Sequence, residues 1–148
     1  MKETSLYILL FLAMTSYSQR ISYTTQDDYI ASGYDVVTYF EDKPTIGDDK
    51  YIVKYDGVKF KFSSVRTMNL FKNSPKKYIP EYGGWCAYAI ALKNKKVTID
   101  PVTYEIRDGN LYLFYKTKFI NTHKKWLTKN PKKLIQKANV NWIGITNK

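Results

Sequence analysis

Two Asp-Gly dipeptides, each between runs of alternating apolar and polar residues, constrain this fold more than any other sequence feature. Asp56-Gly57 joins YIVKY to VKFKF, and the turn Asp108-Gly109-Asn110 joins TYEIR to LYLFY. Asp and Gly tolerate the positive φ angles of a two-residue hairpin turn, and a period of two directs alternate side chains to one face. We therefore predict two antiparallel hairpins from residues 51–55, 58–62, 103–107 and 111–115.

Helical patterns follow each hairpin. A hydroxyl of Ser63 or Ser64 can accept from the free amides of a first turn, which predicts a helix that ends near Asn73. Pro75 then starts a short helical turn. From residue 117 the spacing becomes helical, and Pro131 stops that helix and starts another. The first helix runs through Val65, Met68, Leu70 and Phe71, and the turn carries Tyr78 and Ile79. One buried face is expected to hold Phe119, Ile120, His123, Trp126 and Leu127. The last helix runs through Leu134, Ile135 and Ala138.

The remaining segments give weaker patterns. Residues 33–40 (GYDVVTYF) and 97–99 (VTI) are β-branched or aromatic and predict strands, and Asp100-Pro101 predicts a turn. Residues 86–92 fit a helix or a strand, because their periodicity does not separate the two. The sum is an α+β domain in which small antiparallel hairpins pack with helices.

The first residues predict export. Residues 6–14 (LYILLFLAM) form an apolar stretch of signal-peptide length, too short to span a bilayer, behind Lys2. Small residues before Gln19 suit cleavage there. We predict a signal peptide over residues 1–18, a lead-in over 19–32 and one domain over 33–148. The mature protein is then periplasmic or secreted, and no later segment is apolar enough to span a membrane.

The chain carries a formal net charge of +11, from 24 Lys and Arg against 13 Asp and Glu. Such an excess attracts polyanions through long-range electrostatics. An exported protein seldom meets nucleic acid, so we expect no nucleic-acid partner. The scattered lysines are either a solvated face or a surface attracted to an anionic envelope surface, and screening makes such an attraction sensitive to salt.

The chain has one cysteine, and it lies in YGGWCAYAI, residues 82–90. Cys86 follows Gly83-Gly84 and Trp85, and Tyr88 lies two residues after it. Glycines at this place can adopt positive φ to turn the chain. A lone cysteine in an exported protein has no partner for an internal disulfide. It is a metal ligand, a reactive thiol, half of an intermolecular bridge, or an inert buried side chain.

Five motifs in this order resemble the exported, stand-alone YHS-domain proteins of bacteria. The motifs are GYDVVTYF, KYIVKYDGVKFKFSS, NLFKNSPKKYIPEYGGWCAYAIA, DPVTYEIRDGNLYLFY and ANVNWIG, between about Ile30 and Ile145. The resemblance implies a YHS-like single domain and a binding role, and it carries over Cys86 with its glycine turn. Related modules on metal pumps use a Phe-Cys-Ser context, where this chain has Phe62-Ser63-Ser64, so their metal site does not carry over.

Copper bound through Cys86 is the cofactor that the resemblance favours, although the number of ligands argues against a strong closed site. A closed zinc site needs four Cys or His ligands, but the mature chain holds only Cys86, His123 and one methionine, Met68. Cu(I) needs two or three soft ligands, which these three side chains supply if they meet. A site shared by two chains would ease the shortage and make the protein a homodimer.

Three functions remain open at the level of sequence. The first is a non-catalytic binding protein, with a soft metal such as copper held through Cys86. The second is a thiol-redox accessory protein in which Cys86 reacts. The third is a structural or interaction module with an inert, buried Cys86. Conventional hydrolysis is not expected, because His123 is the only histidine and no nucleophile-elbow or phosphate-binding pattern accompanies it.

Overall fold

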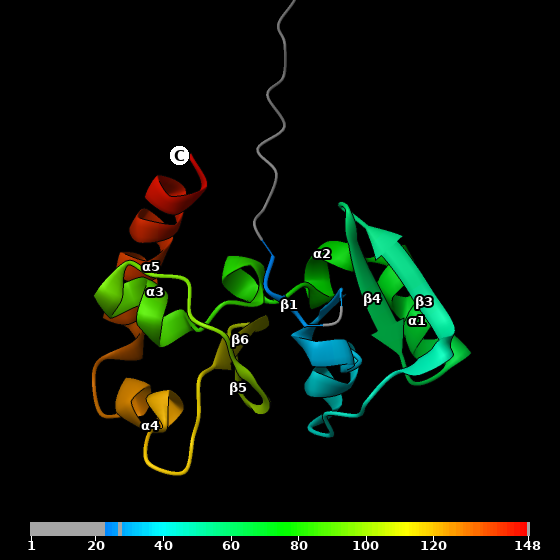
Figure 1. The fold of residues 1–148 in the computed structure, drawn as a ribbon, viewed down its shortest axis with the longest axis horizontal. Helices are drawn as coiled ribbons and strands as arrows, with labels where there is room; N and C mark the ends of the chain where they lie inside the picture. Colours follow the sequence, from blue (N-terminus) through cyan, green and yellow to red (C-terminus); the bar gives the residue numbers. More distant parts are fainter. Residues whose placement is uncertain (1–22, 27, 148) are drawn as a thin grey trace, which may run out of the picture.

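A computed structural model of the chain describes residues 23–26 and 28–147 (Figure 1). The predicted signal peptide lies outside the described residues. Helices and small antiparallel sheets both occur, so the predicted α+β class is confirmed. The strands are β1 (Thr25–Gln26), β2 (Tyr29–Ile30), β3 (Asp48–Tyr55), β4 (Val58–Phe62), β5 (Asp100–Arg107) and β6 (Asn110–Phe114). The α-helices are α1 (Val65–Asn73), α2 (Pro75–Tyr78), α3 (Ala87–Lys93), α4 (Thr122–Leu127) and α5 (Pro131–Thr146), with 3₁₀ helices η1 (Ala31–Gly33), η2 (Thr38–Glu41) and η3 (Glu81–Gly84).

Both predicted hairpins are confirmed. β3 pairs with β4 and β5 pairs with β6, each pair antiparallel and closed by an Asp-Gly turn. Asp56 and Gly57 have φ of 49° and 81°, and Asp108 and Gly109 have 51° and 78°. Positive φ at both central positions is the geometry of the turn that matches the twist of a hairpin. The first hairpin belongs to a four-stranded sheet of order β1-β2-β4-β3, and the second stands as a two-stranded sheet.

The β5–β6 hairpin lies in the middle of the molecule, with β3, β4 and α1 on one side and α3, α4 and α5 on the other (Figure 1). Alternate side chains of β6 pack on opposite sides of the hairpin. Leu111 and Leu113 belong to a first buried cluster, whereas Tyr112 and Phe114 belong to a second. Because successive side chains of a strand point to opposite faces, this one strand joins the two clusters.

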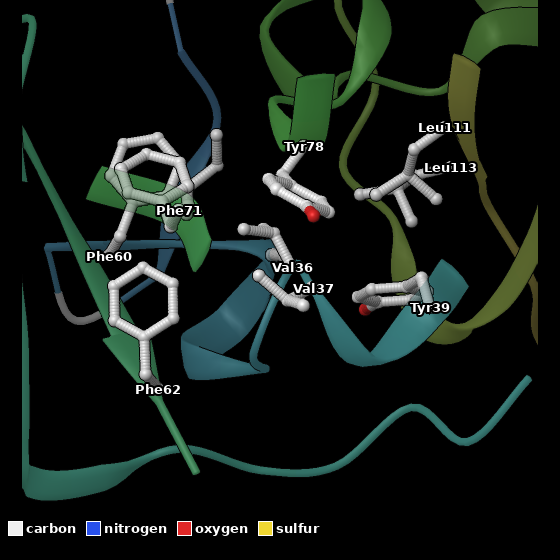
Figure 2. Close-up of a cluster of buried hydrophobic side chains, with 11 residues drawn as sticks. Val36, Val37, Tyr39, Phe60, Phe62, Phe71, Tyr78, Leu111 and Leu113 are labelled. Atoms are coloured by element: carbon white, nitrogen blue, oxygen red, sulfur yellow. The ribbon is translucent and has the colours of Figure 1, made fainter. Parts of the chain in front are cut away.

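Aromatic rings dominate the first cluster. Figure 2 shows Phe60, Phe62 and Phe71 gathered on one side, with Tyr39 on the other. The Phe71 ring centroid lies 4.6 Å from that of Phe60 and 5.1 Å from that of Phe62. Phe71 comes from α1, whose first turn is capped by Ser64, since the Ser64 hydroxyl accepts from the Thr67 N–H at 3.2 Å. The predicted cap and helix are therefore confirmed.

The strand predicted over residues 33–40 is wrong. The segment turns instead, and residues 38–41 form η2. Asp35 causes the turn, because its carboxyl group accepts from the Val37 N–H at 3.0 Å and its carbonyl accepts from the Thr38 hydroxyl at 2.7 Å. Such local side-chain bonds compete with strand pairing. Val36, Val37 and Tyr39 are nevertheless buried, so the apolar residues there serve the first cluster.

The strand predicted over residues 97–99 is also wrong, because β5 begins at Asp100. The predicted Asp100-Pro101 turn lies inside β5, where the pairing shifts register between Asp100 and Tyr104. The Asp100 carboxyl group accepts from the Thr103 hydroxyl at 2.5 Å across this irregularity. The Asp-Pro signal thus marks an irregularity in the pairing of a strand.

The helix predicted from residue 117 begins five residues later. The Asn121 side chain accepts from the Lys124 N–H at 3.0 Å and caps α4 at Thr122. Residues 116–121 form a turn instead, and the expected buried positions Phe119 and Ile120 are 89% and 40% exposed. Leu127 is also exposed, whereas Trp126 is buried as predicted. The helix predicted to start at Pro131 is confirmed and extends to Thr146.

Two further segments are settled. Residues 86–92, left between helix and strand, lie mostly in α3. The described part of the lead-in contributes β1 and β2, and the fully buried Ile30 belongs to the first cluster, so the boundary at Gly33 falls inside the packed unit. In the described residues, no helix is both long and apolar enough to cross a lipid bilayer.

Candidate functional site

The Gly-Gly turn is a run of left-handed residues in η3. Tyr82, Gly83 and Gly84 have φ of 55°, 61° and 82°. The Gly83 carbonyl accepts from the Thr24 N–H at 2.9 Å, so the N-terminal segment crosses the turn closely. A Cβ atom at Gly84 would lie 3.1 Å from the Thr24 side chain, which explains why glycine is suited to this position. Left-handed backbone at Tyr82 is unfavourable for a side chain of that size and is held by its surroundings.

Cys86 is completely buried at the start of α3. Its Sγ atom accepts from the Tyr115 N–H at 3.3 Å and lies 3.4 Å from Thr122 Oγ1. The Thr122 hydroxyl donates to the Tyr115 carbonyl at 2.7 Å, so the thiol is the donor toward Thr122. The backbone N–H of Cys86 donates to the Val97 carbonyl at 2.9 Å. The thiol therefore ties α3 to the end of β6 and the first residue of α4.

Replacement of Cys86 should destabilise the fold. Cys86→Ala removes a buried sulfur and leaves the Tyr115 N–H without an acceptor, so the free energy of unfolding should fall by about 2–3 kcal/mol. Cys86→Ser keeps a donor and an acceptor at this place and should lose less. Urea unfolding monitored by circular dichroism measures both. Equal stability of wild type and Cys86→Ala would contradict the structural role of the thiol.

The three predicted copper ligands occupy different surroundings. Met68 is partly buried on α1 and packs against the first cluster. His123 lies on α4 and stacks on Phe114 of the second cluster, with ring centroids 4.8 Å apart. In residues 23–26 and 28–147, no three His, Cys, Asp or Glu side chains form a group suited to a metal ion. Copper binding through Cys86 stays a prediction that requires the turn before α4 to open.

His123 instead belongs to a charged cluster with Glu105 and Arg107 of β5. Glu105 forms an ion pair with Arg107, and its Oε2 atom lies 3.7 Å from His123 Nε2. Burial alone would raise the pKa of the Glu105 carboxyl, but His123 and Arg107 outweigh burial and lower that pKa. Glu105 Oε2 and His123 Nε2 are buried atoms. This closed arrangement joins β5 to α4 and offers a solute no approach at those atoms.

Trp85 and Tyr88, the two aromatic residues singled out beside Cys86, are partly buried and pack against the second cluster. They complete the packing around α3. Of the candidate site residues that the sequence singled out, Gly83 lines a cavity.

That cavity lies beside the Gly-Gly turn and has a volume of about 270 Å³. Its size is slightly below the roughly 300–1,000 Å³ of typical ligand pockets and suits a small molecule. Lys76 comes from α2 and Trp142 from α5, two helices that lie on either side of the middle of the fold in Figure 1. It is lined by Lys76, Ile79, Pro80, Glu81, Tyr82, Gly83 and Trp142.

Rigid contacts hold the aromatic wall of the cavity. The Tyr82 and Trp142 rings pack edge to face, with centroids 6.1 Å apart. The Tyr82 hydroxyl donates to Asn139 Oδ1 of α5 at 2.9 Å. The left-handed backbone at Tyr82 and this hydrogen bond fix the wall before any ligand enters, which reduces the entropy lost on binding.

Glu81 is a charged residue of the cavity wall whose pKa is shifted by burial. Burial raises the pKa of the Glu81 carboxyl, and it is the only cause that acts on this group. Among the described residues, no side chain forms an ion pair or hydrogen bond with this carboxylate. Lys76 lines the same cavity but is exposed at its rim. The cavity is thus lined by a partly buried carboxyl group that forms an ion pair with no described residue.

Comparisons of the chain with protein-family models, curated proteins and solved structures found no match. The sequence interpretation missed Lys76, Glu81 and Trp142 as candidate site residues. Glu81 directly precedes the glycine motif, which was a usable signal. Trp142 lies 61 positions from Glu81 in the chain (142 − 81), and only the packing of α5 brings it to the turn.

Proposed function

We propose that the chain is a non-catalytic binding module whose ligand site is the cavity beside the Gly-Gly turn. The observation that carries this proposal is Glu81, a partly buried residue that lines the cavity and forms an ion pair with no described residue. A folded protein rarely keeps a desolvated charge that stabilises nothing. The proposal retains the binding role predicted by the resemblance to exported YHS-domain proteins, with Cys86 as a structural residue.

The ligand class follows from the charges and walls of the cavity. Glu81 suits an ammonium group, because a cation there would compensate the partly buried carboxylate. Lys76 at the rim suits a carboxylate, although an exposed lysine contributes less. Ile79, Pro80 and the Trp142 ring suit an apolar body. A small zwitterion of amino-acid size satisfies all three conditions.

The test uses leucine as the probe and two-dimensional NMR of the labelled full chain as the readout. Leucine should shift the amide signals of residues 79–84 and the indole signal of Trp142. Glu81→Gln should weaken binding about ten- to hundredfold, as expected when one charge-assisted hydrogen bond is lost. Lys76→Gln should weaken it by about fivefold or less. Lys77→Gln is the matched control, because its neighbour lines the cavity and it does not.

Glu81→Gln should also make the empty protein more stable. Because the pKa of this carboxyl is raised in the folded state, the carboxylate opposes folding above that pKa. The stability gain of the variant should therefore be largest at neutral pH and vanish as pH falls below the unfolded-state pKa. A stable variant that no longer binds leucine supports the proposal. Unchanged leucine binding in Glu81→Gln, or no signal shift in the wild type, refutes it.

A further inference from the structure

Lysines concentrate in one stretch of the chain, which contributes no residue to the proposed ligand cavity. Residues 116–137, here called the basic end, hold eight lysines and no Asp or Glu, and Asp108 is the last acidic residue of the chain. All eight lysines are exposed. Within the described part of the chain, none of them forms an ion pair with an acidic side chain. Their charge is therefore available to an external anion.

A hydrogen-bonded turn presents an apolar ring at this end. The Thr117 N–H donates to the Ile120 carbonyl at 2.8 Å, and the Ile120 N–H donates to Thr117 Oγ1 at 3.1 Å. Lys116 and Asn121 pair across the base of the turn. Phe119 lies at its tip and is 89% exposed. The hydrogen bonds of the turn therefore hold the Phe119 ring in an exposed position.

The base of the turn is anchored in the core through Cys86. Tyr115 and Thr122 flank the turn, and the Thr122 N–H donates to the Tyr115 carbonyl at 3.0 Å. Both residues also contact the Cys86 sulfur atom. The turn lies next to α4 at the edge of the molecule in Figure 1, so Phe119 and the α4 lysines share one end.

We propose that the basic end docks on an anionic lipid surface, with Phe119 inserted among the lipids. Lysines close to such a surface each add attraction, and an apolar side chain adds burial that salt does not screen. Ile120 and Leu127 are 40% and 51% exposed in the same segment and would enlarge the buried area. This binding function is separate from the proposed ligand cavity and uses none of its residues.

The mixture of side chains favours lipid over nucleic acid. Single-stranded nucleic acid is bound by aromatic platforms on which successive bases stack. The basic end exposes one such ring, Phe119, together with aliphatic Ile120 and Leu127. Aliphatic chains gain free energy in hydrocarbon and offer bases no stacking surface. Anionic lipid headgroups would attract the lysines, and the hydrocarbon below them would take up the apolar side chains.

Vesicle sedimentation of the full chain tests this proposal. Vesicles of phosphatidylcholine alone give the background, which includes any binding by the apolar residues 6–14. Mixing in phosphatidylglycerol should increase binding, and added salt should reduce the increase. Lys124→Gln combined with Lys125→Gln should lower the anionic-lipid increment roughly tenfold. Phe119→Ser should lower it about five- to tenfold.

Matched variants on the far side of the molecule provide the controls. Lys50→Gln with Lys54→Gln on β3 removes the same charge, and Ile46→Ser removes an apolar side chain that is 64% exposed. Both controls should keep the increment within about twofold of wild type. The proposal is overturned if the two lysine pairs behave alike, or if phosphatidylglycerol gives no increase. Binding of single-stranded DNA without binding to anionic vesicles would also overturn it.

Discussion

Asp35→Ala is expected to lower the free energy of unfolding by about 3–5 kcal/mol, one of the two largest effects predicted for a single substitution. Asp35 is completely buried. Its carboxyl oxygens accept from the Val37 N–H at 3.0 Å, the Ser63 N–H at 2.8 Å and the Ser63 hydroxyl at 2.8 Å. Alanine would leave these donors without their acceptor. The η2 turn would also lose its tie to the segment between β4 and α1.

Asp49→Ala is the matched control, because it removes a carboxylate at the surface. Asp49 pairs with Lys61 at 2.6 Å and its side chain is 82% exposed. A surface ion pair contributes about 0–1 kcal/mol, so this variant should unfold close to wild type. Urea unfolding followed by circular dichroism compares the two. Equal losses in both variants would show that the Asp35 hydrogen bonds do not control stability.

The aspartates in turns also show which parts of the fold can be predicted from local sequence. The Asp-Gly turns at residues 56–57 and 108–109 were predictable, because turn chemistry and alternation there act within a few residues. The same residue type at position 35 was placed in a strand. Its carboxyl group bonds to Ser63, 28 positions away, and this partner is invisible to a local pattern. The apolar residues around Asp35 therefore predicted a strand, whereas in the structure they belong to a turn.

The start of α4 shows a similar limit. Phe119, Ile120 and Trp126 share helical spacing, which predicted one buried face. The Asn121 cap moves the start of the helix to Thr122, so the first two positions lie in the turn before it. The Asn121 side chain caps the helix through a hydrogen bond to the N–H three residues later. Because of this cap, Phe119 and Ile120 lie in an exposed turn and not on the buried face of the helix. The positive charge of the basic end could therefore be predicted from the sequence, whereas the exposed turn that carries Phe119 could not.

The candidate site was predictable only at the glycine turn. The motif around Cys86 drew attention to the thiol, since a lone cysteine in a predicted exported protein has few roles. The structure buries the sulfur between Tyr115 and Thr122, which are distant in sequence. The cavity beside the same turn depends on the packing of α5 against η3. Such tertiary contacts determine where a carboxylate such as Glu81 is desolvated, and no local spacing encodes them.

Trp126→Ala is the second substitution with a large expected effect, and its comparison with Trp126→Phe is the sharper test. Trp126 is completely buried, with ring centroids 5.4 Å from Phe114 and 6.0 Å from Tyr112. Alanine would leave a large cavity in the second cluster, so the free energy of unfolding should fall by about 3–5 kcal/mol. Since α4 holds few other buried side chains, it should separate from β6 in this variant.

Trp126→Phe should cost far less. The Trp126 indole N–H is buried, and no described residue accepts a hydrogen bond from it. Burying such a donor costs about 1–3 kcal/mol, which phenylalanine recovers while it keeps most of the ring contacts. We expect a change within about 1.5 kcal/mol of wild type in urea unfolding monitored by circular dichroism. If Trp126→Phe loses as much as Trp126→Ala, the indole N–H makes a stabilising bond. A stable Trp126→Phe protein should also keep its anionic-lipid binding, because α4 and the turn before it stay in place.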